Sequence, residues 1–419
     1  MSDKKNIAVY FLANSVNAAI PFLLLPILTR YLSPLQYGQV AIFIALVSAL
    51  GAFIGLNSVG ASSRVYFDDL TFVEKLRYNN SCVLIFIISS LLVCLILFYF
   101  GLMIEEKIDV PIEYVYFSLF VSMCNYIFQF RLVSFQVRKE AIYFGMFQIS
   151  NSSINCFLSL IFVVSFGLGE FGRILGISLS MLFMAIFSLS SLFKNKIWDF
   201  RVGLNASDIK GALAFGIPLV THVFGGFLLA SADRFVITNY FNASSAGIYM
   251  VAVQISMIFA IVFDALNRAF MPWLFERLSD SSKESHHLIV RMTYSGFLLS
   301  VLIAILASYF IPYILPYLLG EEFIIPSGIL VWLFFAQVFG GMYLAVTNYI
   351  FYSKQTKKLA YVTIISGVIN ILLLVILVPR FDLQGAAIAF FLSKLLQFLL
   401  TWYTANSCFK MPWFKPFDS

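Results

Sequence analysis

Charged side chains within apolar stretches are the residues of this chain whose types could do chemistry. Asp233 and Arg234 are adjacent in one such stretch, and Lys394 lies deep within another. Asp264 and Arg268 are four residues apart with the acid first, an order that favours an ion pair on a helix. Ionised groups are costly at membrane depth, where they mark substrate or ion pathways. We therefore expect these five residues to line a binding cavity, unless Asp264 and Arg268 simply neutralise each other.

Asp233 and Arg234 are expected to serve different partners. On a regular helix, successive side chains point about 100° apart, so an adjacent acid and base cannot both face one group. At least one of the two should therefore contact another helix or the cavity. Arg131 also lies within an apolar run, near its end. We expect its side chain to extend to the cytoplasmic lipid head groups.

The elements that must position these residues are membrane-spanning helices. The chain is 61% hydrophobic and 11% charged, with a mean hydropathy of +0.92, which excludes a soluble globular protein. Apolar runs long enough to cross a bilayer recur along its length and predict about twelve helices, the first of them retained rather than removed as a signal peptide. The expected ranges are 8–29, 38–62, 78–101, 113–137, 143–167, 171–193, 209–240, 246–274, 288–319, 326–352, 358–378 and 384–407.

The charge of the connecting loops predicts how these helices are oriented. One set of alternate loops, together with both termini, holds 19 of the 27 Lys and Arg residues, whereas the opposite loops hold four. Because loops rich in Lys and Arg stay in the cytoplasm, we expect both termini to be cytoplasmic. None of the loops is long enough for a folded domain, so the function is expected to lie within the membrane.

An internal repeat divides the chain into two similar halves. Four pairs of identical residues are 209 positions apart: Thr29 and Thr238, Tyr31 and Tyr240, Gly38 and Gly247, and Gly176 and Gly385. Six helices per half give both halves the same orientation, so parallel repeats with a site between them are expected. The predicted fold is an all-α membrane protein with two parallel six-helix lobes, residues 1–200 and 201–419.

Polar side chains recur at helical spacing on several of the expected helices. Asn14, Gln129, Gln337 and His222 belong to such stripes on four different helices. Because polar groups facing lipid would be unsatisfied, we expect these residues to line a shared hydrophilic cavity. The alternative is that the Asn and Gln side chains hydrogen-bond to neighbouring helices and hold the bundle together.

The charges within the expected helices favour an anionic substrate. Four bases accompany two acids there, and Arg side chains in a site of low dielectric bind phosphates in bidentate fashion. The three His and five Cys residues form no metal-ligand spacing, and no glycine-rich phosphate loop is present. Neither a metal, a cofactor nor ATP hydrolysis by this chain is expected.

Two segments carry a resemblance to a known family. They are Thr29-Arg-Tyr-Leu-Ser-Pro-Leu-Gln-Tyr-Gly38, and Ala232-Asp-Arg-Phe-Val-Ile237 with Gly247-Ile-Tyr249. With twelve spans and cytoplasmic termini, the chain resembles the polysaccharide transporters of the multidrug/oligosaccharidyl-lipid/polysaccharide (MOP) exporter superfamily, which includes the MATE transporters. It resembles the Wzx-type O-antigen flippases most closely. Arg30, Asp233 and Arg234 match motif positions of that family.

The resemblance implies a flippase rather than an enzyme. The expected substrate is an undecaprenyl-diphosphate-linked oligosaccharide repeat unit for O-antigen, lipopolysaccharide or a similar polysaccharide, moved outward across a bacterial inner membrane by alternating access. Membrane lipid and other polysaccharide assembly proteins are the expected partners, and nucleic acid is not. The superfamily also allows coupling to H⁺ or Na⁺, which Asp233, Asp264 or His222 could carry.

Two other functions share parts of this pattern. A multidrug or small-molecule exporter of the same superfamily would have the same topology, but acids within the membrane would suit its cationic substrates better than a surplus of bases. A membrane glycan polymerase or ligase would be expected to carry a large catalytic loop on the outer face, and the sequence has no such loop.

Overall fold

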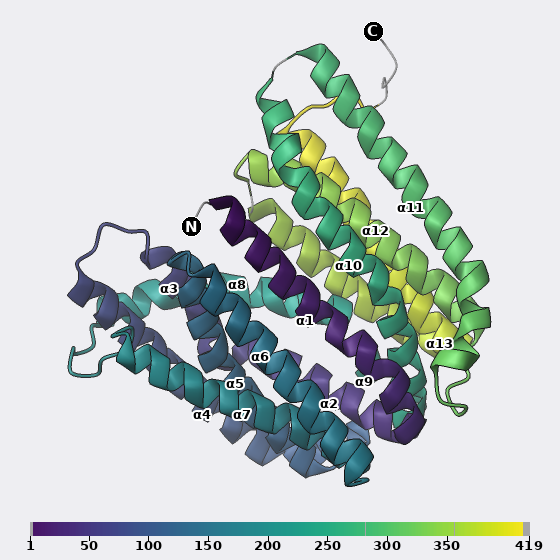
Figure 1. Ribbon diagram of the computed structural model, residues 1–419, viewed down its shortest axis with the longest axis horizontal. Helices are drawn as coiled ribbons and strands as arrows, with labels where there is room; N and C mark the ends of the chain where they lie inside the picture. The colour runs from purple at the N-terminus through teal and green to yellow at the C-terminus, as the bar shows by residue number, and fades with distance from the viewer. Residues whose placement is uncertain (1–2, 281, 356, 414–419) are drawn as a thin grey trace. The chain divides into compact units, whose positions relative to one another are not determined.

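The computed structural model describes residues 3–280, 282–355 and 357–413, and all regular secondary structure within these ranges is helical. A chain in lipid must satisfy its backbone hydrogen bonds internally, and helices do so within each apolar run. Figure 1 shows the elements in chain order. Their bounds are α1 (Asp3–Tyr31), α2 (Pro34–Phe53), η1 (Ile54–Asn57), α3 (Ser58–Val65), α4 (Phe72–Ile108), α5 (Ile112–Val137), α6 (Ala141–Leu160), η2 (Ile161–Ser165), α7 (Gly169–Lys194), α8 (Ala206–Ala230), α9 (Asp233–Tyr240), α10 (Ala243–Ser279), α11 (Lys283–Leu318), α12 (Ser327–Tyr352) and α13 (Lys357–Cys408).

The predicted all-α membrane fold with about twelve helices is confirmed. Ten segments of the described residues are long and apolar enough to cross a membrane. The last of them, α13, contains two of the expected helices, which meet at Asp382 with φ 55° and ψ −144°. α5 has 26 residues but is not among the ten, because its Tyr, Ser, Asn and Gln residues lower its hydropathy. The predicted cytoplasmic side of the termini rests partly on residues 1–2 and 414–419, which lie outside the described residues.

The prediction of one continuous helix over residues 38–62 is wrong in the middle of that range. The helix is interrupted by η1, whose backbone leaves the helical region at Gly55 with φ 73°. A Cβ at Gly55 would lie 2.0 Å from a ring carbon of Tyr126, so both the conformation and the space require glycine. Ser89 of α4 satisfies the freed backbone by accepting a hydrogen bond from the N–H of Gly55 at 2.8 Å.

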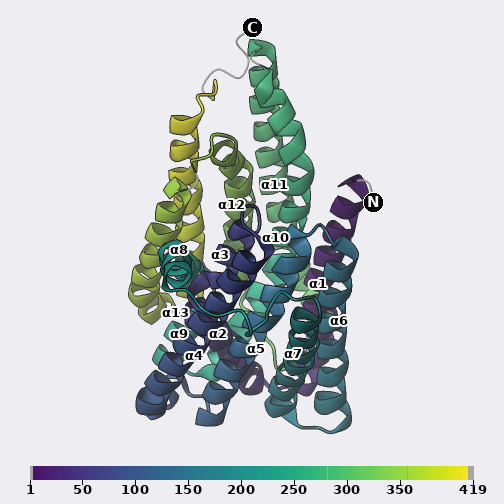
Figure 2. The same ribbon diagram turned by 90° about the vertical axis from the view of Figure 1, so that its left-hand side faces the viewer.

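The chain forms two compact units. Unit 1 comprises Met1–Phe227 and Phe241–Gly247, and unit 2 comprises Leu228–Tyr240 and Ile248–Ser419. In unit 1, α6 packs against α1 and α7, and α5 packs against α2 and α7 (Figure 2). In unit 2, α12 packs against α11 and α13, and α13 also contacts α9. The lobes predicted at 1–200 and 201–419 describe a six-helix repeat and stay a prediction.

The repeated segments make the same local hydrogen bonds. Thr29 Oγ1 donates to the carbonyl oxygen of Leu25 at 2.9 Å, and Thr238 Oγ1 donates to that of Arg234 at 2.8 Å, each reaching back four residues. The following helices are also capped at matched positions. Ser33 Oγ accepts from the N–H of Gln36 at 3.3 Å, and Asn242 Oδ1 accepts from the N–H of Ser245 at 2.8 Å.

The starts of α2 and α10 pack backbone against backbone within unit 1. A Cβ at Gly38 would lie 1.7 Å from the carbonyl oxygen of Ala243, and one at Gly247 would lie 2.0 Å from that of Pro34. Contacts this short leave no room for a side chain. The two glycines that mark the repeat in the sequence therefore let its two copies approach each other.

The second matched pair of glycines also allows close helix packing. A Cβ at Gly176 of α7 would lie 2.7 Å from Ser159 Oγ of α6. A Cβ at Gly385 would lie 2.2 Å from the carbonyl oxygen of Leu377, on the preceding passage of α13. In each half, one glycine therefore brings two consecutive helices together.

Candidate functional site

The Asp233–Arg234 ion pair lies at a break between helices. The expected helix 209–240 ends at Ala230 and resumes at Asp233. Arg234 Nη1 donates to Asp233 Oδ1 at 2.9 Å, and the backbone N–H of Arg234 donates to the same oxygen at 2.9 Å. Nη1 also donates to the carbonyl oxygen of Ala230. The two side chains face each other, because the break removes the regular helical geometry and lets the arginine fold back, so the expectation that they point to different groups is wrong. Arg234 also makes the expected contact with another helix, at Met250 of α10.

This ion pair is buried within unit 2. Asp233 is 3% exposed and Arg234 is 5% exposed. From α10, the buried Tyr249 lies beside the carboxylate, and Met250 Sδ lies 3.1 Å from Arg234 Nη2. Removing two charges from water costs several kcal/mol for each ion. Either partner alone would therefore be a buried, uncompensated charge.

Asp264 and Arg268 form the predicted helical ion pair on α10. Arg268 Nε lies 2.8 Å from Asp264 Oδ2, and the two side chains are 45% and 50% exposed respectively. An exposed pair of this type contributes about 0–1 kcal/mol to stability. The two charges neutralise each other, which is the alternative that the sequence analysis gave for this pair. Both side chains remain accessible on unit 2.

Lys394 lies on the second passage of α13 and has a different environment. Its Nζ lies 3.4 Å from Gln397 Oε1 and 5.6 Å from the centroid of the Phe390 ring. Among the described residues, no acid lies within ion-pair distance of this half-buried ammonium. Because an ammonium has three N–H donors, Lys394 keeps capacity for an anion.

The side chain of Gln337 makes a hydrogen bond between two helices. Its Nε2 donates to Ser256 Oγ at 3.3 Å and joins α12 to α10. Asn348 on α12 likewise donates to Asn267 Oδ1 on α10 at 2.7 Å. Gln337 is buried, so its geometry matches the hydrogen-bonding alternative for the polar stripes.

An apolar cavity of about 240 Å³ lies beside Asn267 in unit 2. Residues of α10, α11 and α12 line it, and a Cβ at Gly296 would meet nothing within 4 Å. The volume exceeds the roughly 150 Å³ that holds a benzene molecule in an engineered protein cavity. The lining includes Phe263, Phe270, Met292, Thr293, Phe297 and Met342. Sequence reasoning missed this cavity because such residues are common on any membrane helix.

The remaining predicted residues, Arg30, Gln129, Asn14 and His222, lie in unit 1. Arg30 is exposed in the last turn of α1, and Gln129 is exposed on α5. Asn14 on α1 and His222 on α8 are half-buried. No hydrogen bond or ion pair shown for the described residues joins Asn14, Gln129 or His222 to another predicted site residue. Their common cavity stays a prediction.

Arg173 is a candidate that the sequence analysis did not single out. It lies within α7, where its Nη1 donates to Asn155 Oδ1 at 2.5 Å and to Ser159 Oγ, both on α6. Directly after α6, the chain forms the π-helical segment η2 (Ile161–Ser165), a conformation that is frequent at functional sites. The sequence signal that could have pointed to Arg173 was Asn155. This polar residue lies within an expected membrane helix, where its side chain needs a hydrogen-bond partner.

Arg131 corrects another expectation. It does not extend to a lipid surface but is 3% exposed within unit 1. Its guanidinium carbon lies 3.9 Å from the centroid of the Phe135 ring, and Nη1 donates to Ser134 Oγ at 3.2 Å. The aromatic face and the hydroxyl contact the guanidinium from within α5 itself, while its buried Nε has no hydrogen-bond partner among the described residues.

Together, the candidate spans define an all-helical, multi-pass membrane protein. The chain aligns with an inward-facing multidrug resistance MATE family transporter of the MOP superfamily at a TM-score of 0.66 and 15% identity, covering 96% of this chain and 94% of that one. A MATE structure in complex with MaD3S aligns at 0.61 and 15% identity, covering 96% and 95%. These likenesses establish the fold.

The chain belongs to the polysaccharide biosynthesis protein family, which its residues 4–278 match. It is 25% identical over 393 residues to Lsg locus putative protein 1 of Haemophilus influenzae, covering 89% of this chain and 90% of the relative. It is 20% identical over 412 residues to the capsular polysaccharide biosynthesis protein CapF of Staphylococcus aureus, covering 95% and 98%. The resemblance predicted from the two sequence segments is confirmed at the level of the polysaccharide biosynthesis family, and the solved MATE structures share its fold.

Proposed function

We propose that the protein flips an undecaprenyl-diphosphate-linked oligosaccharide repeat unit, of O-antigen or a similar surface polysaccharide, from the cytoplasmic to the periplasmic face of the inner membrane. Family membership supports a role in polysaccharide biosynthesis, and the fold supports transport rather than catalysis. Named relatives include a capsular polysaccharide biosynthesis protein. Other polysaccharide assembly proteins would supply the repeat unit and receive it.

The observation that carries the choice of an anionic substrate is the pairing of charges within the helices. Both acids singled out there are already paired, Asp233 with Arg234 and Asp264 with Arg268. In the described chain, Lys394 in unit 2 and Arg131 and Arg173 in unit 1 have no acid within ion-pair distance. Fixed cations in a medium of low dielectric attract an anion strongly, and a diphosphate head group supplies one.

Lys394 is the proposed principal contact of the head group in unit 2, and Arg30, with Gln129 and Asn14, the proposed contacts in unit 1. Alternating access would expose these groups to each side of the membrane in turn. Coupling to H⁺ or Na⁺ through Asp233, Asp264 or His222 remains part of the proposal. The buried Asp233 is suited to coupling, because protonating it would leave Arg234 without its counter-ion.

Replacement of Lys394 tests the proposed contact. Lys394→Ala should reduce export of the repeat unit by at least about tenfold, the effect of losing one charge-assisted hydrogen bond, at normal membrane abundance. Lys394→Arg keeps the charge and should retain most of the export. Lys410→Ala, which removes an exposed lysine beyond α13, is the matched control. Unchanged export by Lys394→Ala would remove this residue from the site.

Deletion of the gene in its native host tests the function itself. We expect loss of the surface polysaccharide and accumulation of single repeat units on undecaprenyl diphosphate at the cytoplasmic face. Intact glycan with altered sensitivity to cationic drugs would instead identify a multidrug exporter. Repeat units that reach the outer face but stay unpolymerised would identify a polymerase or ligase.

A further inference from the structure

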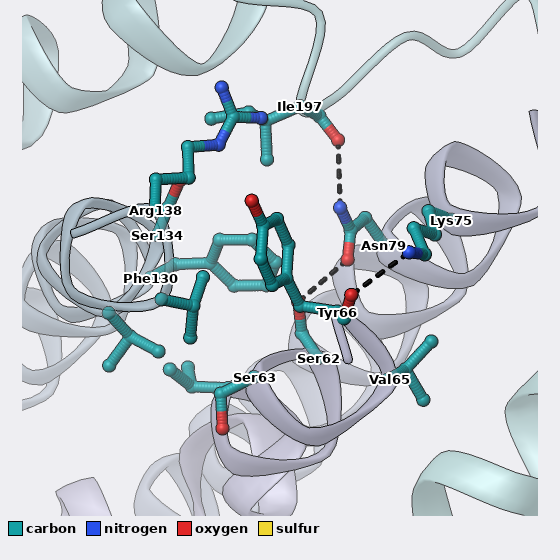
Figure 3. Close-up of a pocket in the computed structure, with 13 residues that line it drawn as sticks. Ser62, Ser63, Val65, Tyr66, Lys75, Asn79, Phe130, Ser134, Arg138 and Ile197 are labelled. Atoms are coloured by element: carbon teal, nitrogen blue, oxygen red, sulfur yellow. Dashed lines mark hydrogen bonds between the residues drawn. The ribbon is translucent and has the colours of Figure 1, made fainter. Parts of the chain in front are cut away.

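Unit 1 contains a small pocket with both apolar and polar walls where three of its helices begin or end (Figure 3). The last turns of α3 and α5 and the first turns of α4 line it, and Ile197 of the segment after α7 closes one side. Its volume is about 40 Å³, which is room for about three water molecules. A phosphate group, whose oxygens replace such waters, is of comparable size.

Two bases and no acid line this pocket. Lys75 Nζ donates to the carbonyl oxygen of Tyr66 at 2.9 Å and lies 5.5 Å from the centroid of the Tyr66 ring. That bond fixes the ammonium and leaves two of its N–H donors. Within the described chain, the Arg138 guanidinium donates no hydrogen bond and has no acid within ion-pair distance. The pocket therefore presents unused cationic donors from two different helices.

The pocket walls are fixed by hydrogen bonds that involve neither Arg138 nor the two remaining donors of Lys75. Ser62 Oγ donates to Asn79 Oδ1 at 2.7 Å, and Asn79 Nδ2 donates to the carbonyl oxygen of Ile197 at 3.2 Å. Figure 3 shows Arg138 and Lys75 on opposite sides of the Tyr66 ring, whose hydroxyl group points to the side of Arg138. Arg131 adds positive charge behind the wall, since it donates to Ser134, another lining residue.

The chain beside the pocket has the character of a membrane interface. Between α3 and α4, large apolar side chains are exposed next to charged ones, and Phe67 and Phe72 are 72% and 58% exposed. Tyr66, Leu70 and Val73 are exposed in the same segment. Aromatic side chains next to a helix end are typical of the head-group region of a bilayer. Segments 64–77 and 138–142 lie on the side predicted to be cytoplasmic, where anionic lipids attract bases. Together they hold five bases and four acids, and none of the acids lines the pocket.

We propose that this pocket binds the phosphate group of an anionic membrane lipid. Arg138 binds the phosphate oxygens, Lys75 adds positive charge from the other side of the Tyr66 ring, and the lipid chains lie along the exposed apolar side chains of residues 66–73. The combination of cations in the pocket with apolar groups at its edge selects a phosphate that is attached to a lipid over one that is free in solution. This site is independent of the proposed transport function.

Lipid titration of the purified, delipidated full-length protein tests the proposal. Phosphatidylglycerol should bind in preference to the zwitterionic phosphatidylcholine, as measured by native mass spectrometry, and inorganic phosphate should not displace it. Arg138→Gln should weaken phosphatidylglycerol binding by about tenfold, because it removes a charge-assisted bond, and Arg138→Gln with Lys75→Gln by more, because it also removes the second positive charge. Arg138→Lys should bind with intermediate affinity.

The matched control removes two bases from the same unit outside the pocket. Lys194 and Arg201 are exposed and do not line it. Lys194→Gln with Arg201→Gln changes the net charge equally and should leave the tight phosphatidylglycerol site intact. Competition between phosphatidylglycerol and undecaprenyl phosphate shows which of the two lipids the pocket prefers. Binding of the phosphate of either lipid would support the proposed site. Equal loss of binding in the control and pocket variants, or displacement of the lipid by inorganic phosphate, would overturn the proposal.

Discussion

The two copies of the internal repeat differ at two adjacent buried positions. Leu24 and Leu25 of α1 are 2% and 5% exposed. The residues 209 positions later, Asp233 and Arg234 of α9, are 3% and 5% exposed. The same place in the repeat is therefore filled once by hydrocarbon and once by an ion pair, at the same degree of burial. Packing alone is satisfied by leucine, so the ion pair must be explained by something other than space.

The surroundings of these positions are otherwise alike. In both copies a threonine four residues on bonds back to the second residue of the pair, and the next helix is capped by a side chain at the matched position. A glycine follows in both and allows close backbone packing. Because buried ion pairs can often be replaced by apolar residues without loss of stability, we infer that the charges of the second copy serve transport.

The largest effect is expected when the ion pair is broken. Arg234→Leu or Asp233→Leu leaves one buried charge without its partner, so each should lower the free energy of unfolding by about 3–5 kcal/mol. Denaturant unfolding of the purified protein in detergent measures this loss. Asp264→Leu breaks an exposed pair and should cost no more than about 1 kcal/mol. Equal effects of the two aspartate replacements would show that burial does not distinguish the pairs.

Glycine replacement tests the contact between the two copies. Gly38→Ala and Gly247→Ala each place a Cβ within 2.0 Å of a backbone oxygen, so the backbones must separate. Overpacking of this kind costs about 1–3 kcal/mol. Gly51→Ala is the control on α2, because a Cβ there meets nothing within 4 Å. Loss of stability by Gly51→Ala equal to that of Gly38→Ala would contradict the close approach.

Removal of the helix caps should lower stability by a smaller amount, which differs between the two caps. Ser33→Ala and Asn242→Ala each remove a side-chain acceptor at a helix start, at a cost of about 1 kcal/mol. Ser33 takes part in a reciprocal capping box with Gln36, so its loss should cost somewhat more than that of Asn242. Thermal unfolding of the two variants measures the order, and a larger loss for Asn242→Ala would be inconsistent with the observed bonds.

The fold was largely predictable, because runs of apolar residues fix where a chain can cross a bilayer. The breaks within those runs were not, since they depend on contacts with other helices. Gly55, for example, turns the chain where the ring of Tyr126 packs against it. The contacts of the charged residues were not predictable for the same reason. The break before Asp233 allows its ion pair, and Arg173 of α7 is held by Asn155 and Ser159 of α6, which accept its hydrogen bonds.

The double variant Asp233→Leu with Arg234→Leu tests the central claim most directly, because it gives the second copy the residues of the first. Its free energy of unfolding should lie within about 1 kcal/mol of the original, since no uncompensated charge remains. Export of lipid-linked repeat units, measured in a deletion strain that carries the variant at normal abundance, should nevertheless be lost. Full export by this stable, uncharged variant would contradict a role of the ion pair in transport.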